Sequence, residues 1–423
     1  MFKKTAGTFL AKVITSLINL AIVIVLSRWM GAQGKGEASL IIAGITMLLL
    51  FCNMIGGASL VYLAPRYNVF QLAVISNLWS IVICAASYFI LSRASIIPER
   101  FVVSVCLLAL INSFLATNLT ILLGKEKIWN YNFILLLQAA INLAVLSVLL
   151  RSLGRNDTGI YIISLYIALL SSLIISTFLI LPYIKDLSFV GFGKITKQLA
   201  RFGIINQAGH VMKFASFRIS YFLLSTHCGN AGVGIYSNGT SLIESLLLIT
   251  NSIATVQYPA IANSDDKVYS QQLTIRLTRL SLLLCVAAMI PLLLLPGSFF
   301  VWLFGQEFNG VRQVILLLSP GILFYNIALI TGHYFSGTGK YKVNTAGNLA
   351  GLLITLALSA IFISSYSISI AAIISTVAYI VTTLTILYYF LREAKISFMQ
   401  LLPVSSDLKW AKEKIMVIMK GGK

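Results

Sequence analysis

Charged residues are scarce in this chain of 423 residues, and acidic ones are the scarcest of all. Asp, Glu, Lys and Arg together make up 10% of the sequence, whereas a soluble domain carries about 25%. Hydrophobic residues account for 58% of the chain, and the mean hydropathy is +0.93. The shortage of charge excludes a soluble globular protein and predicts a polytopic membrane protein.

Cysteine and histidine are also rare, with five and three copies. No C-x-x-C pair occurs, so neither a disulfide framework nor a zinc site is predicted, and the histidines are too scattered for a metal cluster. The segment SGTGK (Ser336 to Lys340) resembles a P-loop, but Tyr334 replaces its first glycine and Tyr341 its final Ser or Thr. We therefore expect a transporter rather than an enzyme, with no catalytic residue, metal or cofactor.

Long hydrophobic runs fill most of the chain. A spanning helix needs roughly 20 mostly apolar residues, and twelve stretches satisfy this rule. The first follows MFKK without a small-residue cleavage site, so it is interpreted as a retained helix rather than a signal peptide. The predicted spans are 8–30, 38–61, 72–92, 101–123, 131–150, 160–182, 202–225, 235–258, 280–300, 311–333, 343–363 and 368–391.

The formal net charge of +19 is explained by where the basic residues lie. Of the 31 Lys and Arg, 21 fall on the side of the N-terminus, seven on the opposite side and three inside spans. Positive residues gather on the cytoplasmic side of a membrane, so both termini are predicted to be cytoplasmic, and no nucleic-acid partner is needed. The lysines of the tail are interleaved with apolar residues, which fits either an interfacial helix held by anionic lipids or a solvated tail.

A repeat divides the chain. Residues 27–39 (SRWMGAQGKGEAS) and 225–237 (STHCGNAGVGIYS) share the pattern S-x3-G-x2-G-x-G-x2-S at an offset of 198. Both are predicted at the turn between the first two spans of a half, where glycine accepts a positive φ at no steric cost. G-K-x-K recurs at 124–127 and 339–342. The matched glycines are Gly31, Gly34 and Gly36 in the first half and Gly229, Gly232 and Gly234 in the second.

The repeat predicts the architecture. Six spans per half is an even number, so the halves share one orientation, and transporters built from repeats bind substrate near the midplane at the repeat interface. The predicted fold is an all-α polytopic membrane protein with 12 transmembrane helices in two six-helix lobes around a central cavity. The predicted divisions are an N-terminal lobe at 1–182, a cytoplasmic inter-lobe loop at 183–201, a C-terminal lobe at 202–391 and a basic cytoplasmic tail at 392–423.

The six-plus-six repeat, the R-W-M-G-x-x-G-x-G turn (Arg28 to Gly36) and the G-K-x-K loops resemble the polysaccharide-transporter branch of the MOP superfamily. Within it, the chain resembles the Wzx-type flippases of O-antigen and similar repeat units. The resemblance implies a bacterial inner-membrane protein that moves a polyprenyl-diphosphate-linked oligosaccharide from the cytoplasmic to the periplasmic leaflet by alternating access, through a cation-lined cavity. It also implies polysaccharide polymerase and chain-length machinery as partners.

Ionisable residues inside spans are rare and are functional candidates by default. Lys213 lies about eleven residues into its span, roughly 16 Å deep at 1.5 Å per residue, which is too deep for its side chain to reach the membrane surface. At 100° per residue, His210 lies about 60° from Lys213 and about 80° from Arg218, as on a helix that borders a large aqueous cavity. The candidate diphosphate-binding residues are Lys213, Arg218, Lys12 and His210.

Several of these residues have a second interpretation. Lys12 either lines the cavity or extends to the headgroups, and His210 is either a proton relay or a structural histidine. Glu244 either forms an ion pair with Lys213 or Arg218 or couples transport to H⁺ or Na⁺. The neighbouring aromatic residues either contact sugar or pack against protein; they are Phe214, Phe217 and Tyr221.

Two other functions were weighed against the flippase. An ion-coupled multidrug exporter of the same superfamily needs carboxylates to hold a cationic drug, but cations outnumber Glu244 inside the spans. A membrane polysaccharide polymerase or ligase needs a sizeable external loop, and every predicted external loop is short. An anionic cargo fits the positive field of the spans better than either alternative.

Overall fold

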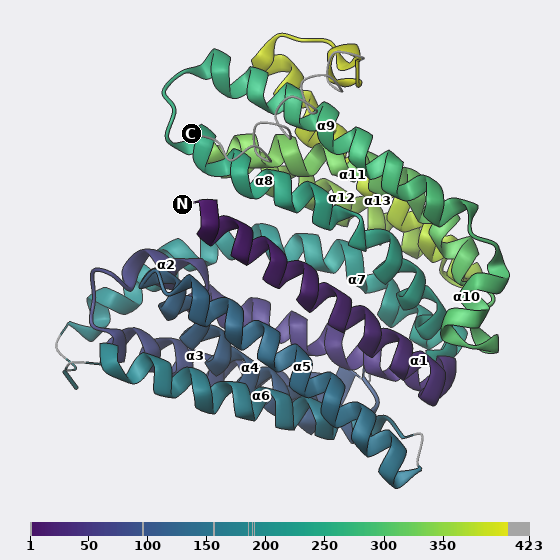
Figure 1. The fold of residues 1–423 in the computed structure, drawn as a ribbon, viewed down its shortest axis with the longest axis horizontal. Coiled ribbons are helices and arrows are strands. Elements are labelled where there is room, and N and C mark those ends of the chain that lie inside the picture. Colours follow the sequence, from purple (N-terminus) through teal and green to yellow (C-terminus); the bar gives the residue numbers. More distant parts are fainter. Residues whose placement is uncertain are drawn as a thin grey trace. The chain divides into compact units, whose positions relative to one another are not determined.

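The computed structural model describes residues 2–94, 97–154, 157–184, 186–187, 189 and 191–404, without the side chains of residues 2–9, 94, 153, 205 and 206. These residues form helices and turns, and none of them lies in a strand. Figure 1 shows the long helices running side by side. They are α1 (Phe2–Cys52), α2 (Ala58–Leu63), α3 (Val69–Ala94), α4 (Glu99–Gly124), α5 (Ile128–Leu153), α6 (Thr158–Ile180), α7 (Phe192–Ser245), α8 (Leu247–Ala262), α9 (Lys267–Leu294), α10 (Gly297–Phe304), α11 (Val311–Gly337), α12 (Tyr341–Ile361) and α13 (Ile368–Ala394).

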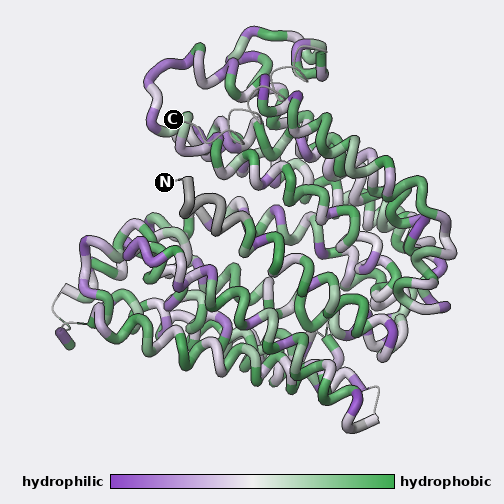
Figure 2. The backbone as a smooth tube through the Cα atoms, in the orientation of Figure 1, coloured by the Kyte–Doolittle hydropathy of each residue, from purple (hydrophilic) through white to green (hydrophobic). Residues whose placement is uncertain are grey.

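The chain is a multi-span membrane protein. Nine helices in the described part are long and apolar enough to cross a membrane, and ten are if α7 and α8 form one bent span. Hydrophobic residues cover the long helices, and hydrophilic ones gather at their ends (Figure 2). With 51 and 54 residues, α1 and α7 each contain about 80 Å of helix in two segments divided at a glycine, against a hydrocarbon core of about 30 Å. Each has room for two crossings, and a total of twelve stays a prediction.

The helices form two compact units. The first contains residues 1–214, 221–235 and 301–308. Within it, α4 packs against α1, α3, α5 and α6, around a core that includes Leu108, Ile121 and Leu146. The second contains residues 215–220, 236–300 and 309–423. There α11 packs against α8, α9 and α13 and is the most buried of the membrane-spanning helices. The predicted division into lobes near 183–201 stays a prediction.

The predicted turn at each repeat motif is a break at a single glycine. Helical backbone runs through both motifs and is interrupted only at Gly31 (φ 65°) and Gly229 (φ 67°). The two residues also have nearly the same ψ, −171° and 177°. One residue in the left-handed region is enough to reverse the local course of a helix, and glycine adopts it without the steric cost of a side chain. We call these two residues the glycine breaks.

The predicted inter-lobe loop is also partly helical, because α7 begins at Phe192 rather than at 202. Ile195 and Leu199 are buried in a small core with Leu60, Leu63 and Leu72. Their spacing of four residues places both on one face of the helix. The first turns of α7 therefore pack against α2 and α3. This packing explains why the segment is helical rather than an extended linker.

Three predicted spans are interrupted. The span at 38–61 is divided between α1 and α2, and the span at 280–300 is divided between α9 and α10. The span expected at 235–258 contains a bend of 40° between Ser245, where α7 ends, and Leu247, where α8 begins. Leu246 has helical angles, but the hydrogen bonds around it are of the i to i+3 kind, from Leu246 N–H to Ile243 O and from Ile249 N–H to Leu246 O. The tighter bonding accounts for the bend, which neither proline nor glycine marks in the sequence.

Candidate functional site

The predicted cations of span 7 lie on α7, in the stretch before its glycine break. His210 is exposed, whereas Lys213 and Arg218 are partly exposed. Lys213 is 16 residues from Gly229, or about 24 Å along the helix axis. Residues 207–245 of α7 form part of the bent apolar span. The expected polar face is therefore present on a helix that is otherwise suited to lipid or protein surroundings.

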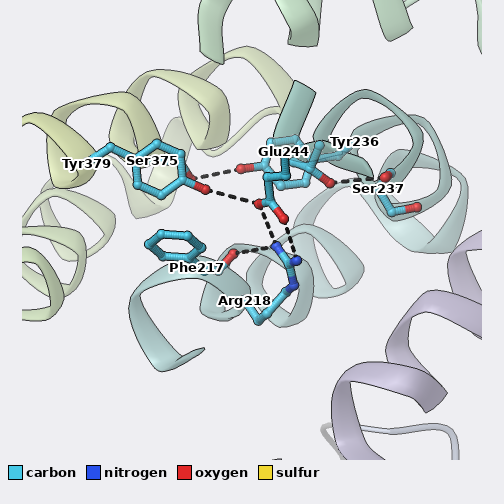
Figure 3. A network of polar contacts seen from close by, with 8 residues as sticks. Phe217, Arg218, Tyr236, Ser237, Glu244, Ser375 and Tyr379 are labelled. Atoms are coloured by element: carbon cyan, nitrogen blue, oxygen red, sulfur yellow. Dashed lines mark hydrogen bonds and ion pairs between the residues drawn. The ribbon is translucent and has the colours of Figure 1, made fainter. Parts of the chain in front are cut away.

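Arg218 forms an ion pair with Glu244 (Figure 3). Its Nη1 donates to Oε1 of the carboxylate at 2.8 Å and its Nη2 to Oε2 at 2.6 Å. The Tyr379 hydroxyl donates to the same Oε1 at 3.1 Å. The Arg218 and Glu244 side chains retain 25% and 16% of their exposure, so the rest of the protein covers most of this charge-assisted bidentate pair.

The geometry matches the structural interpretation of Glu244, with Arg218 as the partner. It also changes the view of Arg218, because a guanidinium already paired with a carboxylate adds little net charge to its surroundings. A coupling role for Glu244 stays a prediction. Lys213 and His210 stay cationic candidates on the same helix.

Aromatic rings enclose the pair on one side. The ring of Phe217 lies 4.4 Å from that of Tyr379 and 5.1 Å from that of Tyr325, measured between centroids. Tyr236, also buried, exchanges a hydrogen bond of 2.8 Å with Ser375 (Figure 3). Packing of this kind positions the α7 side chains against α11 and α13.

The burial of these rings does not fit two of the predicted sugar contacts. Phe217 is buried between other aromatic side chains, and Tyr221 is buried as well. Phe214 is partly exposed and remains a candidate. Spacing along the helix placed all three near the cations, but only the tertiary packing decides which of them is accessible.

Lys12 lies on an exposed face of α1. Asn19, seven residues further on, is exposed as well, and a separation of seven residues returns to within about 20° of the same direction. Leu10 and Leu17 are exposed on this helix too, at about 60% each. The cavity-lining and snorkelling interpretations of Lys12 both require exposure, and both stay open.

The glycine motifs form a helix crossing within the first unit. A Cβ atom on Gly36 would collide with the backbone oxygen of Asn230, and one on Gly234 with the backbone oxygen of Ala32. These four residues form two pairs at the repeat offset of 198, so the contact is reciprocal. Gly34 and Gly232 are buried in the same segments. We call this contact the reciprocal crossing; its glycines allow the two backbones to touch.

Charged residues that the sequence placed in loops hold this crossing together. Glu37 is buried and accepts from Arg100 at 2.7 and 2.9 Å, from Thr158 at 2.7 Å and from Asn230 at 3.5 Å. Lys35 is also buried, with its Nζ donating to Ser39 Oγ at 2.6 Å. A buried carboxylate requires such partners. Sequence reasoning missed Glu37 because Ile235 occupies the matching position of the repeat.

Hydrogen bonds with residues 302–307 hold the chain on both sides of the first glycine break. Glu307 Oε2 accepts from the backbone N–H of Ala32 at 2.6 Å, at the start of the helical segment after Gly31. In return, Arg28 donates to the backbone oxygens of Trp302 and Leu303 at the end of α10. An acid at a helix start and a base at a helix end both complement the helix dipole.

No family model matches the chain. It is 27% identical over 177 residues to the capsular polysaccharide biosynthesis protein CapF of Staphylococcus aureus, covering 41% of this chain and 45% of that protein. A Haloferax volcanii protein named "Probable low-salt glycan biosynthesis flippase Agl15" is 21% identical over 183 residues, covering 43% and 38%. In these matches the chain spans less than half the length of either relative. A protein of the Lsg locus of Haemophilus influenzae is 22% identical over 349 residues, covering 80% and 86%.

Solved structures resemble almost the whole chain. The lipid II flippase MurJ in an inward closed conformation matches with a TM-score of 0.73 and 12% identity, over 99% of this chain and 93% of that one. An inward-facing multidrug resistance transporter of the MATE family and MOP superfamily matches with a TM-score of 0.72 and 15% identity, over 90% and 94%. The chain has the MOP superfamily fold. The MOP fold is that of membrane transporters, in agreement with the resemblance noted in the sequence.

Proposed function

We propose that this chain is a flippase for a lipid-linked sugar, specifically a polyprenyl-diphosphate-linked oligosaccharide such as an O-antigen repeat unit. The names of two relatives, one a capsular polysaccharide biosynthesis protein and one a glycan biosynthesis flippase, support the general assignment. The direction we propose is from the cytoplasmic to the periplasmic leaflet of a bacterial inner membrane, by alternating access.

The observation that carries the proposal is the set of cations on α7. Within a helix segment apolar enough to span a membrane, His210, Lys213 and Arg218 stand against one acid, Glu244. Contact with lipid gives no reason for such residues, and burying them there is costly in free energy. Binding of a diphosphate does give a reason, because lysine offers it a compact positive charge and arginine a bidentate pair of donors.

The Arg218–Glu244 pair suggests how the anion enters. Before substrate arrives, the carboxylate keeps the guanidinium in a fixed orientation. When the diphosphate arrives, one of its phosphate groups offers the guanidinium of Arg218 a second anion. Because the pair is partly exposed, the phosphate can compete with Glu244 for the guanidinium. Lys12 and His210 would add to the positive field.

The test is flipping in proteoliposomes. The probe is polyprenyl diphosphate carrying one fluorescent N-acetylglucosamine, and the signal is its loss of accessibility to a membrane-impermeant quencher. We expect Lys213→Ala to slow flipping by about tenfold, which corresponds to the loss of roughly 1.4 kcal/mol of transition-state binding. Arg218→Ala is expected to slow it as well. Lys342→Ala removes an exposed lysine in the first turn of α12 and serves as the control.

Unchanged flipping by Lys213→Ala and Arg218→Ala would overturn this site. The multidrug exporter is less well supported, because the carboxylate that would hold a cationic drug is already paired with Arg218. H⁺ or Na⁺ coupling through Glu244 and partnership with polymerase and chain-length machinery remain predictions. The proposed lipid contacts of the basic tail concern residues 405–423, which lie outside the described residues.

A further inference from the structure

The exposed face of the bent helix pair α7–α8 is polar. From the end of α7 through α8, five exposed residues carry hydroxyl or amide groups and none carries a charge, while Leu248 and Val256 are the apolar exposed residues between them. All of them belong to the second unit. We call the polar residues the hydroxyl track; they are Ser241, Ser245, Asn251, Thr255 and Tyr258.

Other helices of the same unit show what a lipid-facing surface looks like in this protein. The exposed residues of α9 from 284 onward are Leu284, Val286, Ala287, Ile290, Pro291 and Leu294. Those of α12 from 349 onward are Leu349, Leu353, Leu356, Ala357, Ala360 and Ile361. Both faces are entirely apolar. The hydroxyl track differs from them in kind, because its exposed side chains carry hydrogen-bonding groups.

The chemistry of the hydroxyl track is that of hydrogen-bond acceptors. Ser245 Oγ donates its proton to Leu242 O at 2.6 Å, and Thr255 Oγ1 donates to Asn251 O at 2.7 Å. A hydroxyl that donates its proton to a backbone oxygen of its own helix can still accept hydrogen bonds from outside through its lone pairs. Asn251 adds an amide with both a donor and an acceptor. A partner rich in hydroxyl donors and free of charge fits this surface, whereas a phosphate, which needs donors, does not.

The geometry of the track suits an extended ligand. At 100° per residue, Asn251, Thr255 and Tyr258 fall within about 60° of one another on α8 and span about 10 Å along its axis. The track continues past the 40° bend to Ser245 and Ser241. Ser245 is the immediate neighbour of Glu244, the partner of Arg218. An anion-binding group and a hydroxyl-binding surface therefore adjoin in one unit.

We infer that the hydroxyl track is the surface on which the glycan of the substrate lies during transport. Only a ligand with an anionic end and a long, uncharged, hydroxyl-rich part matches both the Arg218 region and the track beside it. Sugar hydroxyls donate to the track oxygens, and the pyranose rings slide over the intervening Leu248 and Val256. This inference rests on the proposed flippase function, and it assigns the sugar contact to α8 rather than to the buried rings of α7.

The experiment compares two probes in proteoliposomes. One is polyprenyl diphosphate carrying a single N-acetylglucosamine; the other carries a tetrasaccharide built on the same sugar. The test protein combines Ser245→Ala, Asn251→Ala and Thr255→Val. The control is Thr385→Val, which removes a hydroxyl that likewise donates to its own helix, on α13 and off the track.

We expect the triple variant to flip the tetrasaccharide probe about tenfold more slowly than the control, as the loss of two or three hydrogen bonds of about 0.5–1.5 kcal/mol would cause. Its flipping of the single-sugar probe should stay within about twofold of the control. Equal rates with the tetrasaccharide, or an equal fall with both probes, would overturn the inference while leaving the flippase intact. Failure of the unmodified protein with both probes would instead overturn the flippase, and the inference with it.

Discussion

Arg218 and Glu244 are two partly buried charged residues that depend on each other. Each carries a charge into a spanning helix pair, and each is held there by two hydrogen bonds to the other. Tyr379 fixes the carboxylate from α13. Removing either member leaves the other with its charge and without its main charged partner, which is the costly case for an ion pair sheltered from water.

A double-mutant cycle measures this dependence. We expect Arg218→Met and Glu244→Gln each to lower the free energy of unfolding, and the double variant to lose less than the sum of the two. The coupling energy should be roughly 1 to 3 kcal/mol, measured by circular dichroism during unfolding in mixed micelles. Additive losses would contradict the pairing.

Glu307 offers a second test at this scale. Its carboxylate accepts the backbone N–H of Ala32, so Glu307→Ala leaves that donor without its cap. We expect a loss of about 1 kcal/mol, the usual cost of removing an N-terminal cap, measured in the same unfolding assay. Asp265→Ala removes an exposed acid and should have no measurable effect; equal losses in both variants would contradict the capping role.

Individual side chains were predictable where depth alone was decisive. Lys213 stands out because it lies too deep in its span for the side chain to reach the membrane surface, and the ion pair of Glu244 is one of the two interpretations that the sequence allows. The burial of Phe217 was not predictable, because it depends on rings from α11 and α13 that are more than a hundred residues away in the sequence. Glu37 was missed because the matching position of the repeat is Ile235, so the repeat did not mark it.

Among the elements, the reciprocal crossing sets the strictest demand on side-chain size. Gly36→Ala and Gly234→Ala should each destabilise the protein by about 1–3 kcal/mol, the usual cost of overpacking a tight contact. Gly193→Ala is the control, since a Cβ atom at that helical position meets nothing within 4 Å. It should be neutral or slightly stabilising. Thermal unfolding in detergent measures all three, and an equal response would contradict the close approach.

Helix boundaries were predicted well where apolar runs end in polar turns. The spans expected at 72–92, 101–123, 131–150, 160–182, 311–333, 343–363 and 368–391 each fall within three residues of a helix end or inside it. The errors occur where helix continues through polar sequence, as at the glycine breaks and at Phe192. There, neighbouring backbone and buried side chains decide the conformation, and hydropathy carries no such information.

For the molecule as a whole, sequence reasoning predicted an all-helical membrane protein with the MOP fold, and the comparisons with solved structures confirm the fold. The repeat was the main evidence for the two-lobe prediction, because its motifs recur 198 residues apart, almost half the length of the chain. The orientation in the membrane and the count of twelve crossings stay predictions. Charge placement supports the orientation through the cytoplasmic preference of Lys and Arg.

Cys228 provides a natural probe of that orientation. It adjoins the second glycine break and is partly exposed, whereas Cys52, Cys84, Cys106 and Cys285 are buried. If the glycine breaks lie on the periplasmic side, a membrane-impermeant maleimide added to spheroplasts should label the protein, and Cys228→Ser should abolish the labelling. Labelling only after the membrane is permeabilised would reverse the orientation.

The reciprocal crossing has a consequence for how such a chain evolves. Ala32 and Asn230 each supply the oxygen against which a glycine of the other copy rests. A bulkier residue in one copy would therefore push against the backbone of the other, so neither duplicate is free to diverge alone at this point. We expect that after the duplication of an ancestral six-helix gene, these positions became a matched set inherited as one. Separately expressed halves would still carry complementary surfaces by which to find each other.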